Sequence, residues 1–360
     1  MKALFLRENL ALSLEEVAEP QIINNSDVIV RVTASSICGS DIHAWKGHIP
    51  VIPNFILGHE FVGIVAEVGS GVQAFKVGDR VAVPANPFCG ICPNCAAGKV
   101  YNCLTVKGMF GFGKAKGDLP GAQSEYVRVP FADACLTHIP ESVDDEAALF
   151  VGDVLSTGLF AVENGGVKPG DNVAIFGAGP VGLCAVACAR LFNPARLFLI
   201  DIEDYRLDQG KKLGATHVIN PLRQSVIGEI KAATGGYGVD CSIDAVGLPN
   251  ILKDCIVCTT PGGIISVVGI GPPKIEFHMD RFFFRNQTLK GGYVPLTQMK
   301  RLLTLIETGR LDVSSLITHR LPLSEIAEGY EIFAEKLDDC IKVMIIPDQI
   351  YSEMYVFPPH

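Results

Sequence analysis

The sequence predicts a two-domain α/β protein, in which a β-rich, partly barrel-like domain is joined to a doubly wound domain with a parallel sheet. Up to about residue 150, glycine, proline and short alternating runs dominate the chain. From about residue 155 to 295, apolar strand-like runs alternate with helix-like segments. After Pro295, two helix-like segments and a last strand follow. We therefore assign residues 1–154, completed by 296–360, to the first domain and 155–295 to the second.

The strands of the first domain are predicted from alternating apolar and small or polar residues. Residues 27–37 (DVIVRVTASSI), 61–69 (FVGIVAEVG) and 79–85 (DRVAVPA) alternate as strands of an antiparallel sheet or barrel do. Turn-forming stretches at 69–71 (GSG) and 76–79 (KVGD) separate them. These patterns predict short strands joined by tight turns.

The second domain is predicted from strands that alternate with helices, the pattern of parallel βαβ units. The predicted strands are 171–177 (DNVAIFG), 195–201 (ARLFLID), 216–221, 239–247 and 262–270. Helices are predicted at 181–192 and 206–215 in this domain, and at 298–309 and 325–336 beyond it. Residues 340–347 (CIKVMIIP) form the last predicted strand.

Composition and charge limit the classes of function. The chain has 360 residues and a net charge of −9, and no apolar run approaches the roughly 20 residues of a membrane span. We therefore expect no nucleic-acid or membrane partner. The N-terminal segment has no signal-peptide cleavage site, and the chain is long and rich in core residues. These features predict a cytoplasmic protein whose twelve cysteines form no disulfide framework.

Four cysteines occupy one short stretch with the spacing C-x2-C-x2-C-x7-C. They are Cys89, Cys92, Cys95 and Cys103. No strand or helix requires this spacing, but four thiolates in one loop fill every position of a tetrahedral Zn²⁺ site. The motif therefore predicts a structural zinc site. A second set upstream, Cys38 and His59, is too small to close a zinc shell, which is typical of a catalytic site with an open position.

A glycine-rich turn joins a predicted strand to a predicted helix at 177–182 (GAGPVG). Gly177 makes the tight turn, Gly179 lets a pyrophosphate approach the backbone, and Gly182 lets helix and strand pack closely. Together with Pro180 and Val181, these glycines place the helix N-terminus at the phosphates. The motif predicts a dinucleotide site, because it follows a strand and opens a helix.

Asp201 ends the next predicted strand and bears on the choice of cofactor. A carboxylate there accepts hydrogen bonds from the ribose hydroxyls of NAD and repels a 2′-phosphate. Arg206 could accommodate that phosphate, or could be a solvated helix cation that packs on the adenine. We give Asp201 more weight and predict NAD.

These motifs, in this order, resemble the zinc-dependent medium-chain alcohol dehydrogenase family, most closely its secondary-alcohol and polyol branch. The resemblance rests on CGSDIH (38–43), GHE (58–60), the four-cysteine stretch and GAGPVG, and it covers essentially the whole chain. It implies a GroES-like catalytic domain, a Rossmann coenzyme domain and an active site in the cleft between them.

The resemblance also implies the ligands of the catalytic zinc. Cys38 and His59 match the first two ligands of the family. Many members have a cysteine before an S-T-G motif as the third ligand, but this chain has Asp153 there, as bacterial secondary alcohol dehydrogenases do. Glu60 resembles a glutamate that swings onto the metal and that is a regular ligand in polyol dehydrogenases. The third ligand is therefore Asp153 or Glu60, with Asp153 preferred.

Further site residues follow from the same resemblance. Ser40 resembles the first hydroxyl of the family's proton relay, with His43 as the next station unless it is an ordinary, partly exposed histidine. Asp41 would orient the ring of His59, or would only cap a turn. Three other positions match contacts of the family to the nicotinamide, to its amide and to the pyrophosphate: Thr157, Gly269 and Lys342.

The function implied is reversible, zinc-dependent transfer of hydride between a secondary alcohol or small diol and NAD, with two zinc ions per chain. A sugar-polyol or threonine dehydrogenase is the alternative within this class, and a non-catalytic protein that binds NAD and zinc is the alternative outside it. The resemblance also implies a homo-oligomer. The short stretch between the cysteine loop and residues 123–130 favours a tetramer over a dimer.

Overall fold

The computed structural model describes residues 1–271, 274–276 and 278–356, and residue contacts divide the chain into two compact units. The first unit comprises Met1–Asp153, Pro295–Gly309 and Ser314–His360, and the second comprises Val154–Val294 and Arg310–Val313. These limits lie one residue from the domain boundaries expected from the sequence, except that 310–313 groups with the second unit.

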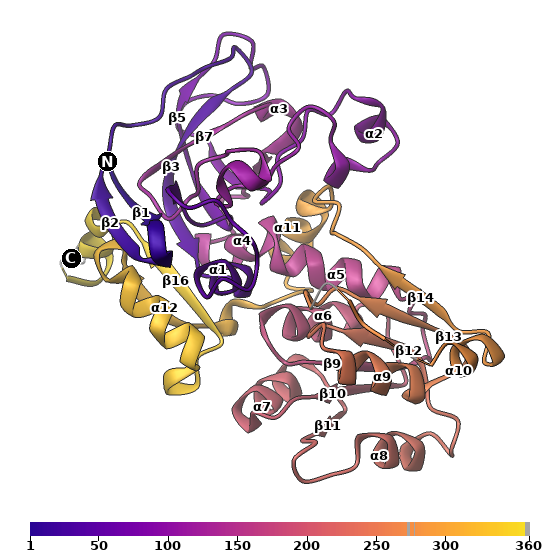
Figure 1. The fold of residues 1–360 in the computed structure, drawn as a ribbon. Coiled ribbons are helices and arrows are strands. Elements are labelled where there is room, and N and C mark those ends of the chain that lie inside the picture. Colours follow the sequence, from indigo (N-terminus) through magenta and orange to yellow (C-terminus); the bar gives the residue numbers. More distant parts are fainter. Residues whose placement is uncertain (272–273, 277, 357–360) are drawn as a thin grey trace. The chain divides into compact units, whose positions relative to one another are not determined.

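The first unit contains two β-sheets (Figure 1). One has three antiparallel strands in the order β2-β1-β4, and the other has the order β15-β16-β3-β5-β6-β8, with β7 paired to β3. Its strands are β1 Lys2–Leu6, β2 Leu12–Glu16, β3 Val28–Ser36, β4 Phe55–Ile56, β5 Phe61–Val68, β6 Arg80–Val83, β7 Tyr126–Val129, β8 Thr137–His138, β15 Ile317–Pro322 and β16 Lys342–Ile346. The C-terminal strand β16 runs antiparallel to β3 and parallel to β15.

Helices in the first unit are short. Its α-helices are α1 Gly39–Trp45, α2 Pro93–Ala96, α3 Ala132–Cys135, α4 Asp145–Leu149, α11 Met299–Glu307, α12 Ile326–Glu335 and α13 Asp348–Tyr351. Single turns of 3-10 helix occur at Glu8–Leu10, Val100–Asn102, Gly113–Lys116, Phe150–Gly152, Ser314–Leu316, Leu323–Glu325 and Leu337–Asp339, and a π-helical turn at Ser352–Val356.

One hydrophobic core of the first unit lies on one face of β3, β5, β6 and β7, and a second joins β1 to α12 and β16. Val30, Phe61 and Val81 are fully buried in the first of these cores, and each such side chain contributes about 1.5–3 kcal/mol relative to exposure. The same cluster includes Cys95 and Cys103 of the four-cysteine stretch. The cysteine loop is therefore packed onto the sheet and is not an independent appendage.

The second unit is a parallel six-stranded sheet with the order β11-β10-β9-β12-β13-β14 (Figure 1). Counted from β9, this is the order 3-2-1-4-5-6 of the doubly wound dinucleotide-binding fold. The strands are β9 Asn172–Phe176, β10 Arg196–Ile200, β11 His217–Ile219, β12 Val239–Asp244, β13 Thr259–Val267 and β14 Thr288–Gly291. The helices are α5 Val154–Asn164, α6 Pro180–Arg190, α7 Asp204–Leu213, α8 Val226–Ala233, α9 Pro249–Cys258 and α10 Met279–Phe284.

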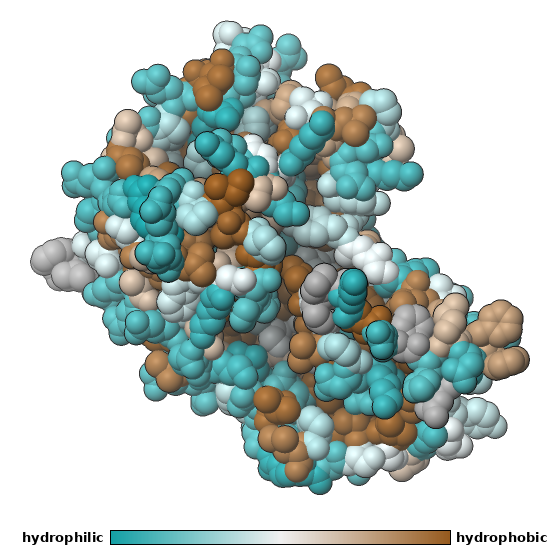
Figure 2. All heavy atoms as spheres, in the orientation of Figure 1, coloured by the Kyte–Doolittle hydropathy of each residue, from teal (hydrophilic) through white to brown (hydrophobic). Residues whose placement is uncertain are grey.

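The predicted fold class is confirmed, and the differences are local. Helix α7 ends at Leu213, two residues earlier than predicted, because Gly214 adopts a left-handed conformation with φ of 112° and terminates the helix. Four helices of the second unit, α5, α8, α9 and α10, were not predicted from the sequence. No helix among the described residues is long and apolar enough to cross a membrane. Hydrophilic side chains cover much of the face seen in Figure 2, with hydrophobic ones interspersed.

Candidate metal centres and dinucleotide site

The four cysteines of the loop converge. Cys89 follows β6, Cys92 and Cys95 flank the first turn of α2, and Cys103 follows the next 3-10 turn. Their sulfur atoms lie within 4.8 Å of one another. The Sγ atoms of Cys92 and Cys95 are 3.4 Å apart, and those of Cys89 and Cys95 are 4.0 Å apart. A zinc–sulfur bond of about 2.3 Å requires tetrahedral sulfurs about 3.8 Å apart, so the set fits zinc.

Hydrogen-bond donors surround these sulfurs. The backbone N–H of Cys92 and the hydroxyl of Thr105 donate to Cys89 Sγ, each at 3.4 Å. The N–H of Leu104 donates to Cys92 Sγ at 3.5 Å. Burial alone would raise the pKa of Cys89, but the hydrogen bonds from Thr105 and from backbone N–H groups outweigh burial and lower this pKa to about 6. These hydrogen bonds therefore favour the thiolate of Cys89, the form that binds metal, whereas burial and the neighbouring Cys92 raise the pKa of Cys95 to about 12.

A second cluster lies elsewhere in the first unit, where Cys38, His59, Glu60 and Asp153 each bring one ligand atom within 4.8 Å of the others. Cys38 precedes α1, the adjacent pair His59 and Glu60 precedes β5, and Asp153 follows a 3-10 turn. The distance from His59 Nε2 to Asp153 Oδ2 is 3.2 Å. Tetrahedral zinc with bonds of about 2.0–2.2 Å to N and O needs about 3.3 Å there, so the donor set fits the metal.

Asp41 holds the His59 ring from behind. Its Oδ1 lies 3.0 Å from His59 Nδ1, and both side chains are fully buried. Its Oδ2 accepts the backbone N–H of Cys38 at 2.9 Å and so caps α1. Asp41 therefore combines the two roles that the sequence left as alternatives. Although burial lowers it, Asp41 and Asp153 raise the pKa of His59 well above its ordinary value.

Glu60 uses its two oxygens differently. Oε2 accepts hydrogen bonds from the Ser36 hydroxyl and the Lys342 ammonium. Oε1 is buried and accepts no hydrogen bond from any residue that the structure describes. A buried carboxylate oxygen without a donor is costly unless a cation completes it. This orphaned oxygen, within a cluster of three other ligands, is a second observation that fits a metal.

Lys342 lies at the metal cluster of the first unit. The resemblance placed it at the pyrophosphate, but its side chain is 1% exposed and lies in the first unit. Its Nζ donates to Glu60 and, at 3.1 Å, to the carbonyl of Ile37. The reason is the pairing of β16 with β3, which directs this cation into the metal cluster.

The two residues predicted for a proton relay lie on α1. Ser40 Oγ is 3.2 Å from His59 Nε2 and therefore borders the metal cluster. The Nδ1 atom of His43 lies 3.2 Å from that of His48. Burial, followed by the neighbouring His48, lowers the pKa of His43. The contact between His43 and His48 could not be predicted from the sequence, because it depends on the turn of the chain after α1.

The glycine loop takes the conformation that a dinucleotide requires. Gly177 has φ of 97°, and a Cβ on Gly182 would lie 1.8 Å from the Gly177 carbonyl oxygen. Pro180 and Val181 start α6 directly after Gly179. Larger residues at Gly177 and Gly182 would strain the turn or push the helix off the strand.

Asp201 lies beside this loop, at the end of β10. Its Oδ2 accepts the backbone N–H of Ala178 at 2.6 Å, and its Oδ1 accepts that of Glu203 at 2.9 Å. The carboxylate is thus fixed next to the phosphate-binding turn. Arg206, on α7, donates through Nε to the Tyr205 hydroxyl at 2.9 Å. The structure places both residues on the segment after β10, where the sequence predicted the ribose contact.

The remaining predicted cofactor contacts lie in the second unit. Thr157 is partly exposed on α5, and Gly269 follows β13, where its N–H donates to the Asp244 carbonyl at 2.9 Å. A Cβ on Gly269 would lie 2.3 Å from the Gly247 nitrogen, so the two loops touch backbone to backbone.

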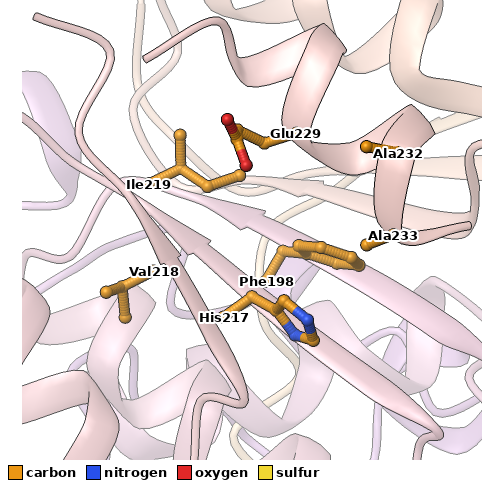
Figure 3. A pocket seen from close by; sticks show the side chains of 7 residues that line it. All are labelled: Phe198, His217, Val218, Ile219, Glu229, Ala232 and Ala233. Atoms are coloured by element: carbon orange, nitrogen blue, oxygen red, sulfur yellow. The ribbon is translucent and has the colours of Figure 1, made fainter. Parts of the chain in front are cut away.

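A small pocket of about 170 Å³ occupies a different part of the second unit (Figure 3). Phe198 and Ile219 contribute apolar side chains from the sheet, and His217 and Glu229 contribute polar ones. The pocket lies against α8 and contains no residue of the glycine loop. It is therefore separate from the predicted cofactor site.

Comparisons with known proteins agree with this geometry. Residues 24–141 match the family model of the alcohol dehydrogenase GroES-like domain, and residues 180–308 match that of zinc-binding dehydrogenases. Sorbitol dehydrogenase of Bacillus subtilis (strain 168) is 33% identical, over 97% of this chain and 98% of its own.

Two solved structures share the fold over nearly their whole length. Alcohol dehydrogenase TADH from Thermus sp. ATN1 superposes with a TM-score of 0.91 at 35% identity, over 96% of this chain and 100% of its own. An alcohol dehydrogenase of Escherichia coli CFT073, solved in complex with NADH, superposes with a TM-score of 0.86 at 29% identity, over 96% and 99%.

Proposed function

The chain belongs to the zinc-dependent medium-chain alcohol dehydrogenase family and is a zinc-dependent alcohol oxidoreductase, and we propose that it interconverts secondary alcohols or small diols and ketones with NAD. The observation that carries this proposal is the cluster of Cys38, His59, Glu60 and Asp153. It has mixed ligands and an orphaned carboxylate oxygen, unlike the closed four-cysteine set. The four-cysteine set would hold a second, structural zinc ion.

We assign the resident catalytic ligands as Cys38, His59 and Asp153. The His59–Asp153 distance supports this choice, and Glu60 Oε2 is already engaged by Ser36 and Lys342. A zinc ion held here would supply Lewis-acid polarisation of the substrate oxygen. The fixed contact of Asp41 to Nδ1 keeps Nε2 of His59 directed at the other ligands.

Ser40 is the first proton acceptor in this proposal. Its Oγ borders the cluster, so it can take the proton of the substrate hydroxyl and pass it towards His43, one turn further along α1. The lowered pKa of His43 keeps its imidazole neutral and able to accept the proton.

The second unit would hold the cofactor. NAD would supply the acceptor for the hydride, with its pyrophosphate at the N-terminus of α6 and its ribose at Asp201. Arg206, Thr157 and Gly269 are the further proposed contacts. We propose the two units as the catalytic and coenzyme domains.

The polyol alternative has one observation in its favour, the position of Glu60 within the cluster. A substrate panel separates the two functions: zinc-loaded protein is incubated with NAD and secondary alcohols, small diols, hexitols or threonine, and NADH is followed at 340 nm. The highest kcat/KM for secondary alcohols or small diols supports our proposal. The highest value for hexitols supports a polyol dehydrogenase, and no reduction with any alcohol contradicts both.

We further propose a cytoplasmic homo-oligomer, with a tetramer favoured. No disulfide is assigned to any of the twelve cysteines, all of which lie in the described part of the chain, and this suits a reducing compartment. Light scattering of the purified protein gives the number of chains directly, and a monomer would contradict the oligomer.

A further inference from the structure

Lys342 is a buried cation supplied to the metal cluster from the far end of the chain. It begins β16, whose Met344 pairs with Ser36 at the end of β3. The N–H of Ile37 donates to the Val343 carbonyl at 3.1 Å, so the segment before Cys38 runs beside β16. This pairing fixes the Lys342 ammonium between the Ile37 carbonyl and Glu60.

Glu60 consequently has one committed oxygen and one free oxygen. Lys342 and Ser36 both bind Oε2. Oε1 is buried, has no donor among the described residues and belongs to the carboxylate that lies with Cys38, His59 and Asp153. Binding of both oxygens to one metal would require loss of the Lys342 and Ser36 contacts.

The buried charges of Glu60 and Lys342 determine how firmly Glu60 is held by the metal. A carboxylate buried without a cation is strongly unfavourable, so a glutamate whose only cation is the metal would stay on the metal. Glu60 has a second cation in Lys342, also 1% exposed. Glu60 therefore stays paired with the Lys342 ammonium when it leaves the metal.

We propose that Lys342 is a positioning residue that makes Glu60 a detachable, single-oxygen ligand of the catalytic metal. This inference rests on the proposed metal at Cys38, His59 and Asp153. Lys342 binds Oε2, and Oε1 is the atom that binds the metal. When Oε1 leaves, its coordination position becomes available to substrate at a low cost in free energy. Lys342 thus controls how readily the metal exchanges a ligand, without touching substrate or cofactor.

Zinc release tests this role without reference to turnover. Zinc-loaded protein is mixed with excess 4-(2-pyridylazo)resorcinol, and the release phase of the catalytic site is identified by its absence in His59→Ala. Lys342→Met should slow that phase at least about fivefold, because Glu60 then has only the metal as its cation. Lys342→Gln, which keeps a donor without the charge, should also slow it and covers the case in which Lys342→Met does not fold. Lys2→Met removes a different lysine–carboxylate pair of the first unit, Lys2 with Asp348, and should change nothing.

A double-mutant cycle distinguishes positioning from a direct effect of charge. Glu60→Gln removes the group through which Lys342 is proposed to act, so Lys342→Met in that background should leave the release rate unchanged. Equal slowing in both backgrounds would show that the cation acts on the metal directly and would overturn the inference. Unchanged release in both single Lys342 variants would overturn it too. If the unmodified protein has no His59-dependent phase, the proposed catalytic metal fails as well.

Discussion

Asp153 is the proposed third ligand of the catalytic metal. Asp153→Ala should lower kcat/KM at least roughly 100-fold and release the catalytic zinc, since even residues behind the ligands cost 10–100-fold in such sites. NAD binding should persist, because the cofactor loop lies in the second unit. Asp153→Cys restores an anionic ligand and should retain zinc with partial activity. Full activity and full zinc content in Asp153→Ala would transfer the ligand role to Glu60.

Ser40 can be tested separately from the metal. Ser40→Ala removes a hydroxyl 3.2 Å from His59 Nε2 but no metal ligand, so zinc content should stay at the level of the unmodified protein. Alcohol oxidation should slow by about 100-fold, the lower end for loss of a proton-transfer group. Stopped-flow rates of NADH formation measure this step. Unchanged rates would remove Ser40 from the mechanism.

Asp201 should determine the choice of cofactor. Its carboxylate repels a 2′-phosphate, so NAD should be preferred over NADP by at least about tenfold in kcat/KM, roughly 1.4 kcal/mol. Asp201→Gly should lower NAD use while NADP use rises or holds, and adding Arg206→Ala should reverse part of that gain. Asp208→Ala, an exposed carboxylate on α7, is the matched control and should leave the ratio unchanged. Equal use of both cofactors by the unmodified enzyme would exclude NAD preference.

The residues that come together in a site were predictable where they lie close together in the sequence. The four cysteines share one loop, and Asp41 lies three residues after Cys38, so spacing in the sequence carries the geometry. The partner of Lys342 lies 282 positions away and becomes visible only once β16 pairs with β3. A single sequence contains no signal for that register, so the contact of Lys342 with Glu60 could not be predicted.

At the scale of an element, the cysteine loop is both a proposed metal site and part of the core. Cys92→Ser should remove one zinc ion per chain and lower Tm by at least about 10 °C, because the loop loses the metal that ties it to the sheet. NAD affinity of the folded fraction should hold. Cys135→Ser changes a buried thiol next to the loop that is no ligand, and it should keep both metals. Unchanged melting with lost NAD binding would contradict a structural role.

Helices and strands were predicted where the hydrophobic periodicity and the residues at its boundaries indicate the same element. Strands β9 and β10 and helix α6 have apolar runs bounded by glycine or aspartate, and the structure places them within one or two residues. Helix α8 has eight residues and only Val226 and Ile230 buried, which is too short for a helical period to stand out. The packing of α8 and α9 on the sheet, through Ile230 and Cys255, supplies the stability that local propensity does not.

For the whole molecule, the two ligand sets predict two zinc ions per chain. Elemental analysis of loaded protein should give two, and His59→Ala and Cys92→Ser should each give one, because the sites share no ligand. The double variant should contain none. One zinc ion or none in the unmodified protein would contradict the assignment of both sites.

The placement of β16 in the sheet of the first unit also sets an order of assembly during synthesis. The second unit is nearly contiguous, and its last strand ends at Gly291, so its sheet can form while the ribosome is still adding residues. The sheet that carries Cys38 and Glu60 gains β16 only after Ile346 has emerged from the exit tunnel. On a nascent chain, the sheet of the second unit can therefore be complete first, and the proposed catalytic metal site acquires its buried lysine only after β16 has been synthesised.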